Sequence, residues 1–242
     1  MYNDDLAYIQ ATAFENPARG ATPEILQRLK DADIPVRHVL DVGCGSGPLT
    51  AALTAAGYRI TAIDQSADLL HIARTAAPAA RFIQGSIYDV ELPFCDAVLA
   101  VGEPLTYHAP ATDADRLVRS FFERVSLALP AGGLLIFDVI ELGKPPLAGR
   151  FWSAGKDWAV MVETTEDQHT RHLVRDIQTF RQTGDLYRRG HEIHSVRLFD
   201  TSALCDQLRL VGFSVETAQS YGAHTLGPRR RAFFATRRSP LP

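Results

Sequence analysis

The sequence predicts an α/β protein built on a doubly wound, mostly parallel seven-stranded sheet with an inserted antiparallel β lid. First, apolar runs alternate with helical patterns of roughly 10–15 residues between residues 36 and 140, as is typical of a parallel sheet covered on both faces. Second, residues 142–199 interrupt this alternation with strand-like runs separated by turn residues. Third, the alternation resumes over residues 200–238, so the sheet is expected to be completed there.

The first apolar run begins at Val36 and ends in a glycine-rich turn, Asp41-Val-Gly-Cys-Gly-Ser-Gly47. Glycines in such a turn adopt positive φ and let the backbone approach a ligand closely, and Pro48 suits the first position of a helix. The stretch therefore predicts a strand, a ligand-binding loop and a helix. Free N–H groups at such a turn suit phosphate, but Asp41 at its mouth disfavours an anion.

A second acid, Asp64, ends the next apolar run, Tyr58–Ile63. In doubly wound folds, a carboxylate roughly 20 residues beyond the glycine loop, at the tip of the second strand, accepts hydrogen bonds from an adenosine ribose. The glycine spacing here is G-x-G-x-G, which differs from the G-x-G-x-x-G of dinucleotide-binding proteins. The pattern favours a cationic, phosphate-free adenosine over a pyrophosphate cofactor.

The other elements of the main domain are indicated by caps, turns and apolar spacing. Residues 2–20 predict a short helix and a turn, and Thr22-Pro23 predicts the start of the next helix. Later helices are expected from Pro48 to about Ala56, after Ser66, after Thr112, which with Asp115 resembles a capping box, and after Asp200. Further strands are expected at residues 81–84, 97–101, 134–138, 213–218 and 232–237.

The interruption is interpreted as a lid. Prolines and glycines at residues 145–155 mark a loop, and strands are expected at 158–163, 173–181 and 186–199. The insertion leaves from the carboxyl edge of the fifth strand, where open α/β sheets bind ligands, so it is expected to roof a pocket. The predicted organisation is a helical cap (1–35), a main domain (36–141 and 200–242) and the lid (142–199).

The motif Asp41–Gly47 resembles the first signature of the class I S-adenosylmethionine-dependent methyltransferases, and the lid resembles that of their small-molecule members. The resemblance continues at Asp64, Gly85-Ser-Ile87, Asp96–Val101 and Pro130–Leu134. It implies a Rossmann-like fold, S-adenosylmethionine as cofactor, S-adenosylhomocysteine as product, and in-line methyl transfer to nitrogen or oxygen of a small organic acceptor. The alternatives are an NAD(P)-dependent oxidoreductase and a non-catalytic sensor or assembly protein that binds S-adenosylmethionine.

The same resemblance implies a set of cofactor contacts along the main domain. Arg19 would pair with the methionine carboxylate, and Asp64 would hold the ribose. Ser86 stands where many relatives carry Asp or Asn for adenine, and the N–H of Ile87 could serve the ring instead. The full set of expected contacts is Arg19, Asp41, Gly43, Cys44, Gly45, Asp64, Gln65, Ser86, Ile87, Val101 and Gly102.

Methyl transfer from a sulfonium mainly requires alignment of the reactants, although an acceptor hydroxyl or amine needs to lose a proton. Tyr107 and His108, in the loop after the fourth strand, are the candidate catalytic residues, and Glu103 is a candidate acceptor contact. His191 and His194 are further candidate acceptor contacts. A metal site is not expected. His191 and His194 are three residues apart on a predicted strand, so their side chains point to opposite faces and cannot bind one metal ion together.

Composition limits the class of partner. Lys and Arg number 25 against 28 Asp and Glu, a net charge of −3, so no basic nucleic-acid surface is expected. The three cysteines lack disulfide or metal spacing, and the sequence shows neither a secretory signal nor a run long enough to span a membrane. A cytoplasmic protein is expected, a monomer or homodimer that acts on a small molecule without nucleic-acid or membrane partners.

Overall fold

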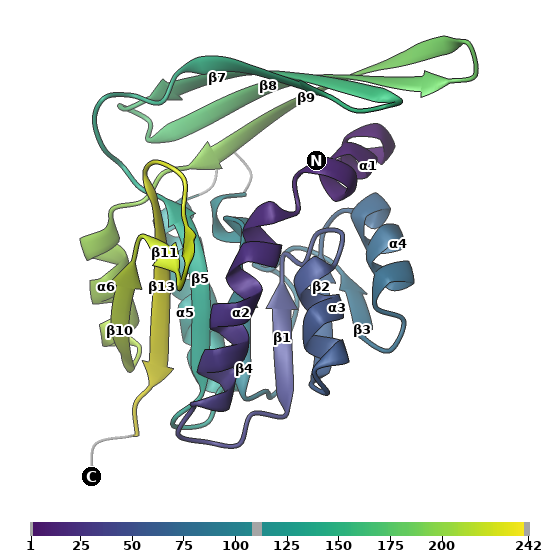
Figure 1. Ribbon diagram of the computed structural model, residues 1–242. Helices are drawn as coiled ribbons and strands as arrows, with labels where there is room; N and C mark the ends of the chain where they lie inside the picture. Colours follow the sequence, from purple (N-terminus) through teal and green to yellow (C-terminus); the bar gives the residue numbers. More distant parts are fainter. Residues whose placement is uncertain (1, 108–112, 240–242) are drawn as a thin grey trace.

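The computed structural model describes residues 2–107 and 113–239, which form a Rossmann-like α/β fold (Figure 1). Seven of their strands make one sheet in the spatial order β10-β13-β5-β4-β1-β2-β3, in which β13 runs antiparallel to both of its neighbours and the other pairs are parallel. In chain order these strands are β1 (His38–Val42), β2 (Arg59–Asp64), β3 (Arg81–Gln84), β4 (Ala97–Ala100), β5 (Leu134–Ile140), β10 (Phe213–Ala218) and β13 (Arg230–Arg237). The predicted mostly parallel, seven-stranded sheet is confirmed.

Helices cover both faces of this sheet (Figure 1). One core cluster joins Leu40 and Phe137 of the sheet to α5 (Ala114–Ala128) and α6 (Thr201–Leu210). The other joins the opposite face to α2 (Asn16–Lys30), α3 (Pro48–Ala55) and α4 (Ala67–Ala76). The central strands are buried on both faces, and accordingly β4 is wholly apolar and β1 is apolar apart from His38 and Asp41. The carboxyl ends of the parallel strands are thereby fixed along one edge.

A separate four-stranded antiparallel sheet lies above that edge (Figure 1). Its strands are β6 (Gly149–Ala154), β7 (Trp158–Asp167), β8 (His172–Thr183) and β9 (Leu186–Arg197). The helix α1 (Asp4–Ala13) lies beneath it, and Leu6 and Ile9 pack with Trp158, Val160 and Ile177 of the sheet. We call this four-stranded sheet the lid.

Charged contacts also join α1 to the lid. Arg188 of β9 bonds both Asp4 and Asp5, and the Tyr8 hydroxyl lies 3.3 Å from Asp157. The guanidinium of Arg181 lies 3.5 Å from the centre of the Tyr8 ring, within cation–π range. The N-terminal helix therefore belongs with the lid in packing as well as in position.

Several predicted boundaries were wrong. The helix predicted to start at Thr22 begins at Asn16, with Pro17 in its first turn and Pro23 inside it. Thr22 is therefore no N-cap, and its hydroxyl instead donates to the Ala18 carbonyl. A strand, β6, lies within the loop predicted at residues 145–155.

The helix predicted after Thr112 has Asp113 as its N-cap, whose carboxylate accepts from the Arg116 N–H, and Thr112 lies outside the described residues. The caps predicted at Ser66 and Asp200 are confirmed by bonds from the N–H groups of Leu69 and Ala203. Two short elements, β11 (Ser220–Tyr221) and β12 (His224–Thr225), were not predicted. A 3₁₀ turn, η1 (Pro104–Thr106), follows β4. Within 2–107 and 113–239, no helix combines the length and apolar character that crossing a bilayer requires.

Two residues of α5 test the core. Phe121 is fully buried against Phe122 and Tyr88, whereas Leu127 on the same helix is 76% exposed. Phe121→Ala is expected to lower the free energy of unfolding by about 3–5 kcal/mol, because it removes a buried ring and leaves a cavity. Leu127→Ala is expected to change it by less than about 0.5 kcal/mol. Urea denaturation measures both, and equal effects would contradict the packing described.

Candidate functional site

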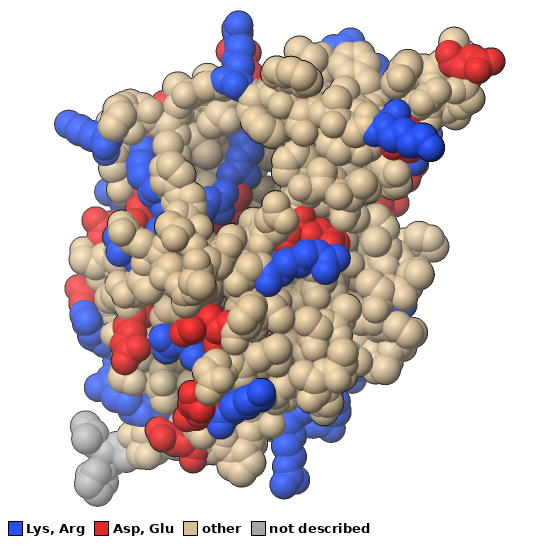
Figure 2. Space-filling view, in the orientation of Figure 1, with Lys and Arg blue, Asp and Glu red and all other residues tan. Residues whose placement is uncertain are grey.

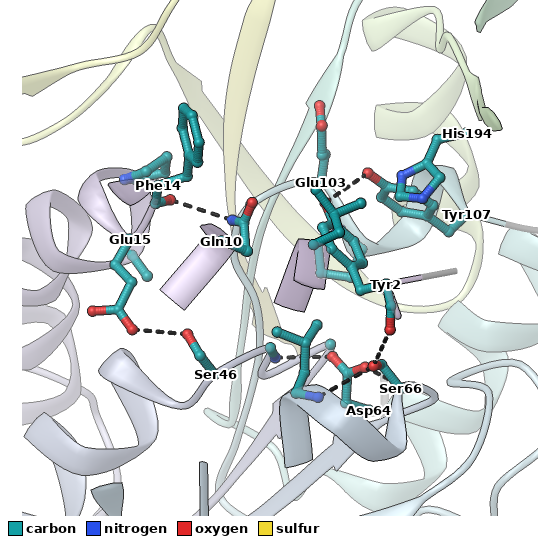
Figure 3. Close-up of a pocket in the computed structure, with 18 of the residues that line it drawn as sticks. Tyr2, Gln10, Phe14, Glu15, Ser46, Asp64, Ser66, Glu103, Tyr107 and His194 are labelled. Atoms are coloured by element: carbon teal, nitrogen blue, oxygen red, sulfur yellow. Dashed lines mark hydrogen bonds between the residues drawn. The ribbon is translucent and has the colours of Figure 1, made fainter. Parts of the chain in front are cut away.

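A cavity of about 550 Å³ lies between the carboxyl edge of the main sheet and the lid. Its lining comes from the glycine loop after β1, the end of β2, the segments after β3 and β4, the junction of α1 and α2, and the inner face of the lid. In Figure 3, Asp64 and Ser66 lie on one side of it, Tyr107 and His194 on another, and Phe14 and Glu15 on a third. The volume is within the range of roughly 300–1,000 Å³ that small-molecule sites occupy.

The glycine loop has the conformation that its sequence requires. Gly43, Gly45 and Gly47 have φ of 75°, 57° and 85°, a region that side chains other than glycine rarely adopt. A Cβ on Gly43 would lie 2.3 Å from a side-chain atom of Pro104, so this glycine also lets the two loops pack together. A Cβ on Gly45 would meet nothing within 4 Å. Gly43, Cys44 and Gly45 all line the cavity.

Asp64 connects this loop to the second strand. Its Oδ2 accepts from the Gly45 N–H at 2.8 Å, and its Oδ1 accepts from the Ser66 N–H at 2.9 Å. The residue is 8% exposed and lines the cavity, and burial raises the pKa of its carboxyl. Each oxygen has two lone pairs, so the carboxylate can accept further bonds from a ligand in the cavity.

Asp41 lies behind this surface and does not line the cavity. Its Oδ2 accepts from the Thr50 hydroxyl at 2.5 Å, and the residue is 2% exposed. Burial raises the pKa of the Asp41 carboxyl to about 6, with a smaller contribution from the charge of Asp64. The structure therefore gives Asp41 a supporting position at the start of α3, and the predicted direct contact with a cofactor stays a prediction.

The other predicted cofactor residues lie along the same cavity. Gln65, Ser86, Ile87, Val101 and Gly102 all line it. The Ser86 hydroxyl already accepts from the Tyr88 N–H at 3.2 Å. Ile87 is 7% exposed.

Asp138 of β5 shapes the loop that follows β4. Its carboxylate accepts from the N–H groups of Gly102 and Glu103, each at 2.9 Å, and from the Tyr221 hydroxyl at 3.0 Å. Glu103 has φ of 64°, which is uncommon for a residue with a side chain. The Asp138 bonds fix the backbone that leads into that residue. Sequence reasoning missed Asp138, because an acid in a buried strand gives no sign of which backbone it bonds.

Tyr107 lies at the end of this loop and meets the lid. Its hydroxyl lies 3.4 Å from that of Tyr2 and accepts from Arg175 of β8 at 3.2 Å. Burial raises the pKa of both tyrosines, so both are neutral near pH 7. The other predicted catalytic residue, His108, lies outside the described residues.

His194 of β9 packs against the same tyrosines. Its Nε2 lies 2.9 Å from a carboxylate oxygen of Glu192, and its Nδ1 is buried with no hydrogen-bond partner among the described residues. The ring centre lies 4.9 Å from that of Tyr2 and 5.9 Å from that of Tyr107. His194 thus lines the cavity while its ring is held by Glu192.

Two predicted residues lie away from the cavity lining. Arg19 is exposed and pairs with Glu15, whose other oxygen accepts from the Ser46 hydroxyl. His191 is on the outer face of β9 and pairs with Asp176 at 3.0 Å. Their predicted ligand contacts stay predictions. Cavity residues that sequence reasoning missed include Tyr2, Glu15, Arg175 and Arg230.

The comparisons with known proteins agree with this geometry. A family model described as a methyltransferase domain matches residues 39–126, which contain the glycine loop and Asp64. YqeM of Bacillus subtilis (strain 168), assigned as a methyltransferase, is 24% identical over 221 residues, covering 86% of this chain and 87% of that protein.

The chain contains a methyltransferase domain, and its fold is that of the S-adenosylmethionine-dependent methyltransferases.

Solved structures share the fold of this methyltransferase. An S-adenosylmethionine-dependent methyltransferase from Clostridium acetobutylicum has a TM-score of 0.81 at 17% identity, covering 96% of this chain and 98% of that one. The sugar N-methyltransferase KedS8 from Streptoalloteichus has a TM-score of 0.74 at 19% identity, covering 96% and 91%. A methyltransferase domain over residues 39–126 argues against the oxidoreductase alternative.

The buried Asp41 generates a pH-dependent prediction. Because its folded-state pKa is about 6 and the unfolded reference is 3.8, folding favours the protonated form, and this stability is lost as pH rises through about 6. Asp41→Asn cannot ionise. Its free energy of unfolding relative to wild type is therefore expected to rise by about 2–3 kcal/mol between pH 4 and pH 7.

Urea denaturation at several pH values measures this difference. Asp185→Asn, in the exposed turn between β8 and β9, is the control and should show little such change. A difference between Asp41→Asn and wild type that is independent of pH would show that Asp41 titrates normally in the folded protein.

Proposed function

We propose that this methyltransferase transfers a methyl group to a nitrogen or oxygen of a small organic acceptor that binds beneath the lid. The observation that supports this most strongly is that the main domain and the lid together line one cavity. Its floor carries the glycine loop and Asp64, and its roof carries Val160, Ile177 and His194 of the lid. A roofed cavity of about 550 Å³ suits a small molecule better than a macromolecular chain.

The residues fit the cofactor that the family uses. Asp64 has free lone pairs facing the cavity for the ribose hydroxyls, and Gly43 to Gly45 let a ligand approach the backbone. Ser86 and Ile87 would border the adenine, and Val101 and Gly102 would lie towards the reacting end. When bound, S-adenosylmethionine supplies an activated methyl group, so the protein needs no covalent nucleophile.

The chain's own task is to align the acceptor and exclude water. Tyr107 is neutral, and its hydroxyl is held by Arg175, so it can orient an acceptor but is poorly suited to remove a proton. His194 is the second candidate. If its Nε2–H donates to Glu192, its Nδ1 carries a lone pair. That atom is buried in this structure, so taking the acceptor's proton requires the His194 ring to move.

The name of one structural neighbour, a sugar N-methyltransferase, is consistent with a hydroxyl-bearing or amine-bearing acceptor for this chain. The acceptor can be found by incubating the purified protein with methyl-labelled S-adenosylmethionine and pools of small metabolites. Transfer of label to a small molecule supports the proposal. Tight cofactor binding with no transfer to any pool would favour the sensor or assembly role.

Asp64→Asn is expected to weaken S-adenosylhomocysteine binding by about 1–3 kcal/mol, because one acceptor oxygen is replaced by a donor. Isothermal titration calorimetry measures the affinity. Asp68→Asn, an exposed acid in the first turn of α4, is the matched control and should bind normally. Unchanged affinity in Asp64→Asn would refute the ribose assignment.

His194→Gln is expected to slow methyl transfer to a hydroxyl or protonated amine by roughly 10²–10⁴-fold, the usual contribution of a general base. S-adenosylhomocysteine affinity should be unchanged. His191→Gln is the matched control, since His191 is on the same strand but the opposite face. Equal rates in wild type and His194→Gln would remove this histidine from the mechanism.

A further inference from the structure

Two arginines share one buried carboxylate beside the proposed acceptor site. Glu103, in the loop after β4, is 5% exposed. Arg175 Nη1, from the lid, lies 2.7 Å from its Oε1, and Arg230 Nη1, from the start of β13, lies 3.0 Å from its Oε2. The pKa of the Glu103 carboxyl is lowered because the attraction of the two guanidinium groups outweighs burial. The carboxyl is therefore ionised at neutral pH.

Two guanidinium groups and one carboxylate leave an excess positive charge at this place. The other acids that line the main cavity, Glu15 and Asp64, already bond other groups. Tyr2 and Tyr107 are neutral. Asp138 is buried and its carboxyl is within electrostatic range of Arg230, but it does not line the cavity, and its oxygens accept from the Gly102 and Glu103 N–H groups and from a tyrosine hydroxyl. Glu192, which holds His194 opposite Arg175 across the lid strands, does not line the cavity, and its oxygens face the Asn3 N–H and the His194 ring.

The arginines on either side of Arg230 are arranged differently. Arg229 pairs with Glu166 at 2.7 Å, and Arg231 pairs with Glu141 at 3.1 Å, so each has a carboxylate of its own. Arg230 shares its carboxylate with Arg175. Among the described residues, the other N–H groups of Arg175 and Arg230 have no acceptor apart from the Tyr107 hydroxyl, which Arg175 bonds.

Those free N–H groups face open space. Arg175 and Arg230 both line the main cavity, and both line a second cavity of about 280 Å³ that adjoins it. Arg150 is the third arginine there, and no acidic residue of the described chain lines that second cavity. Figure 2 shows Lys and Arg atoms in the recess between the lid and the main domain. The two cavities therefore meet at a pair of guanidinium groups.

We propose that the methyl acceptor carries an oxyanion, a carboxylate or phosphate, which binds between Arg175 and Arg230 where the two cavities meet. A guanidinium presents a planar fork that matches both groups in a bidentate manner. A partly buried, uncompensated charge is unfavourable, so an incoming anion supplies the second negative charge that the cluster lacks. The acceptor's anionic group would then lie next to Tyr107 and orient its reacting atom.

This inference depends on the proposed function, because the anion is taken to belong to the acceptor. The test is calorimetric titration with inorganic phosphate and with malonate, at low ionic strength, with and without saturating S-adenosylhomocysteine. One or both anions should bind to wild type, and the stronger of them shows whether the acceptor group is a phosphate or a carboxylate. Arg230→Gln should weaken this binding about 10-fold or more, and Arg230→Lys, which keeps the charge but loses the fork, less so.

Two further variants make the test specific. Glu103→Gln removes the shared negative charge, so it should bind the anion more tightly than wild type. Arg231→Gln also removes one charge from β13, but from an arginine with its own partner, and should bind like wild type. Thermal denaturation checks that each variant is folded.

The possible failures are distinguishable. If S-adenosylhomocysteine binds but neither anion does, or if Arg231→Gln weakens binding as much as Arg230→Gln, the oxyanion site is refuted while the methyltransferase proposal stands. Weaker anion binding by folded Glu103→Gln would also refute it. If S-adenosylhomocysteine fails to bind, the proposed function fails, and the titrations without it still report on the arginine pair.

Discussion

The Asp64 carboxylate joins three elements at one point of the cavity wall. Its two oxygens accept from the Gly45 N–H in the loop after β1 and from the Ser66 N–H at the N-cap of α4, and Asp64 itself ends β2. The Ser66 bond is buried and the Gly45 bond is partly buried, so the loss of the Ser66 bond in particular would leave a polar group unpaired, which is costly. The side chain that fixes the glycine loop is also the one proposed to receive the ribose. Loop geometry and cofactor binding therefore depend on the same carboxylate.

The acceptor half of the cavity depends on contacts between the lid and the main domain. Arg175 extends from β8 to Glu103, and that glutamate is held in its uncommon backbone conformation by Asp138. The helix α1 adds a second connection, since it packs on the lid and brings Tyr2 against Tyr107 and His194. The roof of the cavity is thus tied to the loop after β4, where transfer is proposed to occur.

The sequence predicted the main sheet and most of its helices because buried parallel strands and caps leave local patterns, as at Ser66 and Asp200. It failed where tertiary packing overrode a local signal. Pro23 was expected to start a helix but lies inside α2, and glycines and prolines concealed β6. The placement of most proposed cofactor residues along one cavity was predictable, since they follow strand ends in order. The Arg175–Glu103–Arg230 cluster was not, because its members come from three distant segments, and strand alternation does not show which face turns to the cavity.

The proposed cofactor site and the proposed acceptor site therefore share one cavity, with Asp64 on its floor and His194 on its roof. The most direct test of this account is a crystal structure of the protein with S-adenosylhomocysteine. The account predicts ribose hydroxyls within hydrogen-bond distance of Asp64 and a sulfur atom directed towards the space beside Tyr107 and His194. A nucleoside bound elsewhere, or one that leaves Asp64 with only its two backbone partners, would contradict it.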